Sequence, residues 1–386
     1  MHSNKPRLQP IILLALLGAV AASASAASVV YVSNADSKDI YVLSLNEKNG
    51  DLTLLEKVDT GATVMPLAIS PDHRHLYASL RSQPYSVVTY AINAENGKLS
   101  RVSVVALADN MANLATDKSG RYLFAASYAG HKISVNRISP DGEVMTPPVS
   151  VTNTGKNAHA IATDPSNAYL FASNLGSDVI LQYKFDDVSG AITPNTPAAV
   201  ATKPGAGPRH FVFHPSKRFV YSTNELDGTV NTYAYNAEQG VLTLQSTDSA
   251  VPPASTLGVS MSGAGTFVTP TGPNLTAAAA PATADIHLTP DGRFLYASER
   301  SSSTLAAYRV DAKSGALTAI GNYATETQPR GFNIDPLGKY LLAVGQKSNG
   351  LSSYAINQKT GVLKPLAHVD MGKNPNWVEI IALPSK

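Results

Sequence analysis

The stretch RHFVFHPSKRFVYSTNELDGTVNTYAYNAEQGVLTLQSTDSA, at residues 209–250, decides the fold. It holds four short runs rich in β-branched and aromatic residues, at 210–213, 219–223, 229–235 and 242–246, with polar turns between them. Runs of this length, separated by turns rich in Pro, Asn, Asp and Gly, are typical of strands joined by hairpins. The stretch therefore predicts one antiparallel unit of four strands.

The same unit recurs along the whole chain. A turn glycine, any residue and an aliphatic residue form a triplet whose glycines are spaced by 47, 45, 48, 50, 75 and 46 residues: Gly50, Gly97, Gly142, Gly190, Gly240, Gly315 and Gly361. Short β-rich runs such as 76–79, 123–126 and 295–298 keep the same phase. Four-stranded units at 40 to 50 residues, without a helical period, are typical of propeller blades. We expect an all-β, seven-bladed β-propeller with four antiparallel strands per blade.

The two ends of the chain complete the seventh blade. The repeat begins at the second strand of its unit, and the run at 377–382 supplies a spare strand at the other end. Pairing these ends would close the ring without an open edge. Residues 27–386 are thus expected to form a single domain, and the 75-residue interval to hold a loop insertion, rich in Ala, Gly, Pro and Thr, at about 251–282.

The first 26 residues have the pattern of a signal peptide. Lys5 and Arg7 precede a short apolar run at 11–20, and small residues at 24–26 suit cleavage. The run is shorter than the roughly 20 apolar residues that span a bilayer. We expect an exported protein, periplasmic or secreted, without a membrane span after cleavage.

Composition excludes several classes of site. Cleavage after residue 26 leaves 28 basic and 28 acidic residues, a balance that argues against nucleic-acid binding. The chain has no cysteine, which excludes disulfides, a thiolate nucleophile and cysteine-based metal sites. No phosphate-binding glycine loop, dinucleotide fingerprint or zinc-protease motif is present, so we expect neither a cofactor nor a metal. A monomer is expected.

The ends of the two inner strands of each blade predict where a site lies. The innermost strand begins, and the second ends, on the same face, so these positions ring the mouth of the central channel. The residues after the second strands are Ala35, Arg81, Tyr128, Leu175, Glu225, Arg300 and Gln346. Those at the starts of the innermost strands are Met65, Ala112, His159, Arg209, Ala284, Arg330 and Asn376, with His210 and Asp285 one residue further along. Four arginines at one mouth predict an anionic or oxygen-rich small ligand.

Several of these motifs resemble a known family. The run 205–215 followed by 224–226, the run 284–293 and the segments 328–333, 345–348 and 79–81 are similar to the 6-phosphogluconolactonases of the β-propeller type. Carboxymuconate-lactonising enzymes are related members. The resemblance implies the same fold and a lactonase that acts on a sugar-derived lactone without a metal.

The resemblance also implies roles for individual residues. The catalytic set of the lactonising relatives matches His159, Arg209, Glu225 and Arg300. Glu225 would be the general base, Arg209 and Arg300 would hold an anionic group and the oxyanion, and His159 would protonate the leaving oxygen. Further substrate contacts are expected from Arg81, His210, Asp285, Arg330, Gln346 and Lys347. His287, inside an innermost strand, is interpreted as a packed residue.

Two alternatives stay open. A muconate-type lactone cycloisomerase would use the same glutamate and histidine, and a non-catalytic exported propeller would bind a ligand or a partner protein. If the protein is a lactonase, export from the cytoplasm favours an unphosphorylated sugar lactone over a phosphorylated one as the substrate. The insertion at 251–282 precedes Asp285 and departs from the family pattern beside the predicted mouth.

Overall fold

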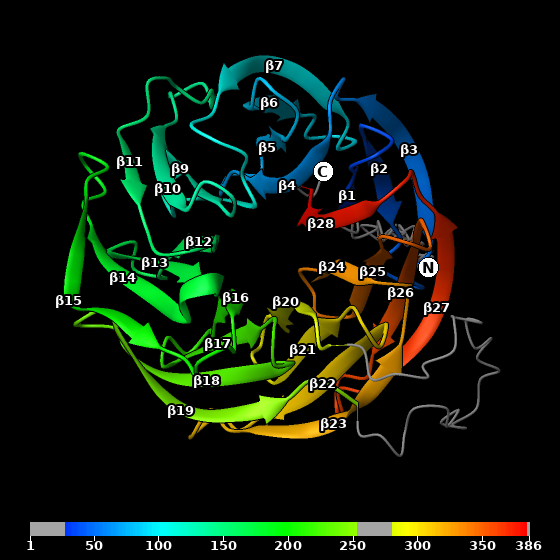
Figure 1. Cartoon of the computed structure of the whole chain (residues 1–386). Helices are drawn as coiled ribbons and strands as arrows, with labels where there is room; N and C mark the ends of the chain where they lie inside the picture. The colour runs from blue at the N-terminus through cyan, green and yellow to red at the C-terminus, as the bar shows by residue number, and fades with distance from the viewer. Residues whose placement is uncertain (1–27, 253–279, 384–386) are drawn as a thin grey trace, which may run out of the picture.

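Seven four-stranded antiparallel sheets stand around a central axis in the computed structural model of the chain (Figure 1). The structure describes residues 28–252 and 280–383. The predicted signal peptide, and residues 253–279 of the predicted insertion, lie outside this part of the chain. The prediction of a seven-bladed all-β propeller is confirmed.

The blades follow one another in chain order. The first joins both ends of the chain, in the order β28 (Pro375–Ala382), β1 (Ser28–Asn34), β2 (Asp39–Leu45) and β3 (Leu52–Asp59). The second and third are β4 (Val64–Ile69), β5 (His75–Leu80), β6 (Ser86–Ile92), β7 (Leu99–Ala106), then β8 (Asn113–Thr116), β9 (Tyr122–Ser127), β10 (Lys132–Arg137), β11 (Ser150–Asn153).

The remaining four blades repeat the same order from the axis outward. They are β12 (Ala158–Thr163), β13 (Tyr169–Asn174), β14 (Val179–Phe185), β15 (Ile192–Ala201); β16 (Pro208–Phe213), β17 (Phe219–Asn224), β18 (Thr229–Asn236), β19 (Val241–Ser249); β20 (Thr283–Leu288), β21 (Phe294–Glu299), β22 (Thr304–Val310), β23 (Leu317–Ala324); and β24 (Pro329–Ile334), β25 (Tyr340–Gly345), β26 (Gly350–Ile356), β27 (Leu363–Asp370). A 3-10 turn, η1 (Leu175–Ser177), follows β13. None of the described helical segments has the length or apolarity to cross a membrane.

The terminal strands pair as the sequence predicts. In β28 and β1, Ile381 lies opposite Val29 and Val378 opposite Val32 in an antiparallel register. Both strands are largely buried, with their apolar side chains in clusters shared with the neighbouring blades. The ring is therefore closed by main-chain hydrogen bonds and apolar packing together.

The repeated glycine has a physical reason. Each of the seven turn glycines adopts a positive φ between 65° and 85° and lies directly against a side chain near the start of the second strand of the preceding blade. The partners are Tyr340, Val29, His75, Tyr122, Tyr169, Phe219 and Phe294. In four blades a tyrosine two positions further along also donates its hydroxyl to the glycine carbonyl, as Tyr221 does to Gly315 at 2.8 Å. The repeat thus marks the contact that joins one blade to the next.

We predict that Gly315→Ala lowers the free energy of unfolding by about 2–4 kcal/mol, the cost of a left-handed alanine plus that of overpacking. An alanine Cβ at this position would lie 2.5 Å from Cδ1 of Phe219. Gly61→Ala is the matched control, because Gly61 also has a positive φ of 72° but no atom within 4 Å of the added methyl group. Urea unfolding of both variants measures the difference, and equal losses would contradict a contact between blades.

Candidate active site

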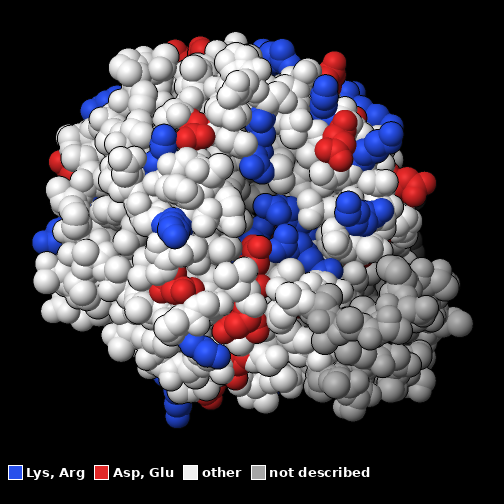
Figure 2. All heavy atoms as spheres, viewed as in Figure 1, with Lys and Arg blue, Asp and Glu red and all other residues white. Residues whose placement is uncertain are grey.

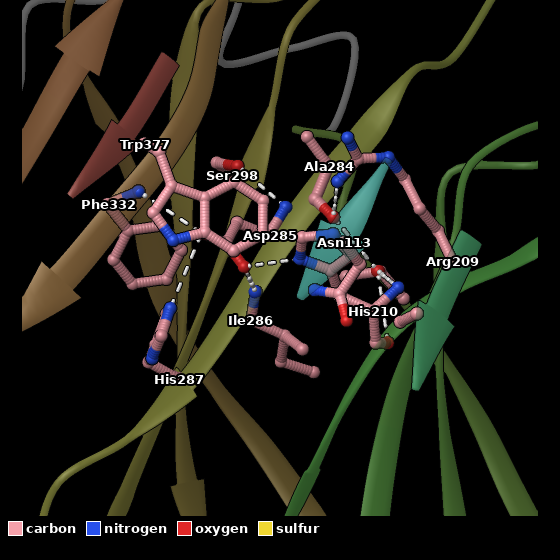
Figure 3. Close-up of polar contacts among 12 residues, drawn as sticks. Asn113, Arg209, His210, Ala284, Asp285, Ile286, His287, Ser298, Phe332 and Trp377 are labelled. Carbon is pink, nitrogen blue, oxygen red and sulfur yellow. Dashed lines mark hydrogen bonds and ion pairs between the residues drawn. The ribbon is translucent and has the colours of Figure 1, made fainter. Parts of the chain in front are cut away.

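Irregular pairing turns side chains toward the channel at its mouth. In β4, β12, β16, β20 and β24 the register against the second strand shifts within the first residues, between Pro208 and Phe211 in β16 and between Thr283 and Ile286 in β20. Such a bulge re-aims side chains that would otherwise alternate between the two faces of a strand. Consecutive residues of one innermost strand, such as Arg209 and His210, can therefore both contribute to one site (Figure 3).

Arg209, Glu225 and Arg300 form a cluster of charges at the mouth. Nε of Arg209 lies 2.8 Å from Oε2 of Glu225, and Nη2 of Arg300 lies 2.9 Å from Oε1 of the same carboxylate. The side chain of Arg209 is 1% exposed, that of Arg300 16% and that of Glu225 21%. Arg209 also donates to the carbonyl of Ala284, and Arg300 to that of Ala282. Both carboxylate oxygens of Glu225 are thus engaged by arginines.

Positive charge dominates this end of the channel. Figure 2 shows Lys and Arg side chains gathered near the centre of the face it presents. The side chain of Arg330 makes no ion pair or hydrogen bond to any residue within 28–252 and 280–383, and burial together with the charges of Arg209 and Arg300 lowers its pKa well below the ordinary value. Burial lowers the pKa of Arg209 to about 10 against the opposing effect of Glu225, so Arg209 stays charged at neutral pH. The cluster therefore favours an anion.

The same field fixes the charge state of Glu225. Burial alone raises its pKa, but the charges of Arg209 and Arg300 outweigh this and hold the pKa below the ordinary glutamate value. A carboxylate that is paired on both oxygens and has a lowered pKa is a weak base. In this structure Glu225 therefore holds the two arginines beside one another, and its general-base role stays a prediction.

His159, His210 and Asp285 form a second group beside this cluster. Nδ1 of His210 lies 2.7 Å from Oδ1 of Asp285, and the rings of His159 and His210 meet edge to face with centroids 5.2 Å apart. Burial and the charge of Arg209 lower the pKa of His159 well below 6.5 and that of His210 to about 4. Both imidazoles are therefore neutral at neutral pH.

Below the arginines, the channel holds a cavity. Its volume is about 200 Å³, and its polar lining includes Asn113, His210, Asp285, His287, Asn333, Trp377 and Glu379. Nε2 of His287 lies 3.3 Å from Oδ2 of Asp285, and the Trp377 indole donates to Glu379 at 2.8 Å. Burial raises the pKa of Glu379 to about 7. No group of three or more His, Cys, Asp or Glu side chains is placed to hold a metal ion among the described residues.

The remaining predicted residues lie around the rim. Gln346 and Lys347 line a polar pocket of about 160 Å³ with Asp36, Gln328 and Asn374, and Gln346 donates to Asn374 at 2.9 Å. Arg81 is held by Asn110 and by the Met65 sulfur, and its charge contributes to lowering the pKa of Arg330. The structure thus brings Arg209, Glu225 and Arg300 into one cluster and His159, His210 and Asp285 into a group beside it, with Gln346 and Lys347 in a separate rim pocket.

Of the polar residues that line the channel cavity, only His210 and Asp285 were among the site residues predicted from the sequence. His287, Asn333 and Glu379 lie four residues after the first residue of β20, β24 and β28, and Trp377 lies two residues after that of β28. Asn113 is the first residue of β8. Because side chains on a strand alternate with a period of two, these positions face the same side. A comparison of those positions between the blades would have found these residues. The structure also shows that His287, interpreted from the sequence as a packed residue, contacts Asp285 as well as packing against Phe332.

Comparisons with known proteins give a consistent result. A family model described as a seven-bladed β-propeller lactonase matches residues 26–380. The chain is 40% identical over 355 residues to a 6-phosphogluconolactonase of Pectobacterium carotovorum, with 92% of this chain and 99% of the relative covered. For one of Xenorhabdus nematophila the identity is 39% with the same coverage. A solved structure of a periplasmic gluconolactonase from Pseudomonas aeruginosa is also similar, with a TM-score of 0.80, 26% identity, and 93% of this chain and 100% of that chain covered.

We predict that Glu225→Gln destabilises the protein at neutral pH by about 3 kcal/mol, because it removes the partner of two largely buried arginines. The folded-state pKa of Glu225 is lowered, so its contribution is fully present above the unfolded pKa and is lost as the pH falls through the folded pKa. Urea unfolding at neutral and acid pH should show the gap between variant and parent narrowing in acid. A gap that is independent of pH would contradict the ionised pair.

Proposed function

The chain belongs to the seven-bladed β-propeller lactonase family, and on this basis we propose that it hydrolyses a sugar-derived lactone at the arginine-rich mouth of the channel. The observation that carries the proposal is the cluster in which one carboxylate holds two arginines beside a third, Arg330, that has no partner among the described residues. A lactone becomes an oxyanion when water attacks its carbonyl and ends as a carboxylate. Both species suit such a cluster.

The residues divide the work as follows in this proposal. Arg300 and Arg330 contact the lactone and its developing oxyanion, while Glu225, which also pairs with buried Arg209, fixes the orientation of Arg300. His159, which burial keeps neutral, donates a hydrogen bond to the leaving oxygen and does not act as a strong acid. Gln346 and Lys347, with Arg81, contact hydroxyl groups or a phosphate further out.

The substrate class depends on where the protein works. We propose export through residues 1–26 and a mature domain at 27–386, with the periplasm or the medium as destination. The relatives at about 40% identity are named 6-phosphogluconolactonases, and the structural relative at 26% identity is a periplasmic gluconolactonase. Export favours an unphosphorylated lactone, since phosphorylated pentose-pathway intermediates are made in the cytoplasm.

We predict that the mature protein hydrolyses gluconolactone faster than the uncatalysed reaction, and faster than its 6-phosphate, with EDTA present. Arg300→Ala should lower kcat/KM at least about tenfold, because a donor to the oxyanion is lost. Arg121→Ala is the matched control, an exposed arginine paired with Asp187 on another part of the surface. Rates are measured by base titration against a blank without protein.

Three results would change the proposal. Rates equal to the blank for both lactones would overturn it and favour a binding propeller, and muconolactone turnover alone would favour the cycloisomerase. Loss of activity in EDTA, restored by a divalent metal, would contradict the metal-independent reaction.

We also predict cleavage after Ala26. Expression of the full chain in a bacterium with two membranes should place the protein in the periplasmic fraction, with residue 27 as its N-terminus by Edman or mass-spectrometric sequencing. A chain without residues 1–26 should stay in the cytoplasm. Recovery of the uncleaved chain in the cytoplasm would contradict export.

A further inference from the structure

The Asp285–His210 pair lines the channel cavity and adjoins the arginine cluster. His210 is the neighbour of Arg209 in β16, and both His210 and Asp285 line the cavity (Figure 3). We propose that this pair is the proton-transfer group of the site, with Nε2 of His210 as the atom that takes the proton from the attacking water. The proposal rests on the lactone hydrolysis proposed above.

The contacts of Asp285 fix the tautomer of His210. Asp285 accepts hydrogen bonds from the main-chain nitrogens of Ile286 at 3.0 Å and Phe332 at 3.2 Å, and it faces His287 on its other side. Burial raises its pKa, but the two histidines outweigh this and hold it well below the ordinary value. An ionised carboxylate can only accept, so Nδ1 of His210 carries the hydrogen and donates at 2.7 Å. The lone pair of the neutral ring is then on Nε2.

That lone pair has no partner among the described residues. Nε2 of His210 is buried and makes no hydrogen bond to them, and the same holds for Nδ1 of the adjoining His159. Leaving a buried polar nitrogen unpaired is costly unless the site uses it. A water or a lactone oxygen held in the cavity would lie beside this imidazole and could supply the missing partner.

The alternative base is engaged elsewhere. Both oxygens of Glu225 are in ion pairs with arginines. The pKa of Glu225 is lowered and that of His210 is lowered to about 4, so basicity does not separate the two groups and the unpaired nitrogen of His210 does. His210 instead combines a free nitrogen with a carboxylate that orients the ring, which is the arrangement of a general base and its orienting partner. The charged groups that face its ring are Arg209 on its own strand, Asp285 on β20 and Arg330 on β24, with neutral His159 on β12.

The reaction balances with water as the only co-reactant. The water oxygen bonds to the lactone carbonyl carbon while one of its protons moves to Nε2 of His210, which gives a tetrahedral oxyanion and an imidazolium stabilised by Asp285. The ring C–O bond then breaks, and the same proton passes from Nε2 to the leaving oxygen. The products are a hydroxy acid and the neutral imidazole.

The test begins with the parent protein, because turnover of any lactone above the blank establishes the function independently of the base. His210→Gln should then lower kcat by about 100-fold or more, the usual worth of a general base, with KM within about threefold. Asp285→Asn should lower kcat at least about tenfold with a similarly small change in KM, because it upsets the ring tautomer. His368→Gln is the matched control, since His368 also places Nδ1 2.9 Å from a carboxylate, that of Glu326, but is half exposed.

Chemical rescue separates proton transfer from a structural role. Added imidazole should restore part of the activity of His210→Ala and none of that of Arg300→Ala. Folding is followed by the fluorescence of Trp377, the single tryptophan of the chain, whose ring centroid lies 5.6 Å from that of His210. If His210→Ala does not fold, the rates of Asp285→Asn and His210→Gln decide.

The outcomes are distinct. Folded His210 variants that keep kcat within about threefold of the parent would overturn the proton-transfer role and leave the lactonase standing. A large loss in Glu225→Gln that imidazole does not restore, beside active His210 variants, would return the base to Glu225. A parent protein that turns over no lactone would overturn both proposals.

Discussion

The contact between each turn glycine and the blade before it is the constraint on which the rest of the structure depends. At seven places the backbone of one blade lies against a ring or a branched side chain of the preceding blade, with a φ that only glycine adopts without strain. These contacts lie where the second strands begin, at the end of the blades opposite the mouth. The contacts that set the spacing of the blades therefore lie on the face opposite the mouth. The side chains at the mouth take no part in these contacts and can differ from blade to blade.

The site follows from this arrangement. The innermost strands pack against one another around the axis, so equivalent positions in blades that are far apart in sequence converge at the mouth. Arg209 and Glu225 come from one blade, Arg300 from the next and Arg330 from the one after it. Register shifts at the starts of these strands add a second ring of positions, which contributes His210 and Asp285. A regular scaffold thus supports an irregular set of charges.

The sequence predicted where the strands and the mouth residues lie, but not which side chains contact one another at the mouth. The hydrophobic runs and turn glycines located the blades, the closing strand 377–382 and both sets of mouth residues, because strand period and antiparallel direction determine these features. These patterns could not show that both oxygens of Glu225 form ion pairs with arginines, or that His210 pairs with Asp285. Those contacts depend on bulges and on the distance between neighbouring blades. Glu225 was therefore expected as a base, although its contacts are those of an anchor. The role of Trp377 and Glu379 in lining the channel was missed for a simpler reason, since the positions after the first residue of each innermost strand were considered only for His210 and Asp285 and were not compared across all seven blades.

The charge balance of the mouth fits the proposed lactone hydrolysis. The lactone carbonyl is neutral, its transition state is anionic and its product is a carboxylate, so a strongly positive site would also bind the product tightly and slow its release. Glu225 offsets part of the charge of Arg209 and Arg300, while Arg330 has no such partner among the described residues. In the proposed reaction Arg330 stabilises the oxyanion as its charge develops, while Glu225 limits how strongly the mouth holds the fully formed acid. In this proposal the partly exposed Glu225 has two effects: it lowers the net positive charge at the mouth, and it orients Arg209 and Arg300.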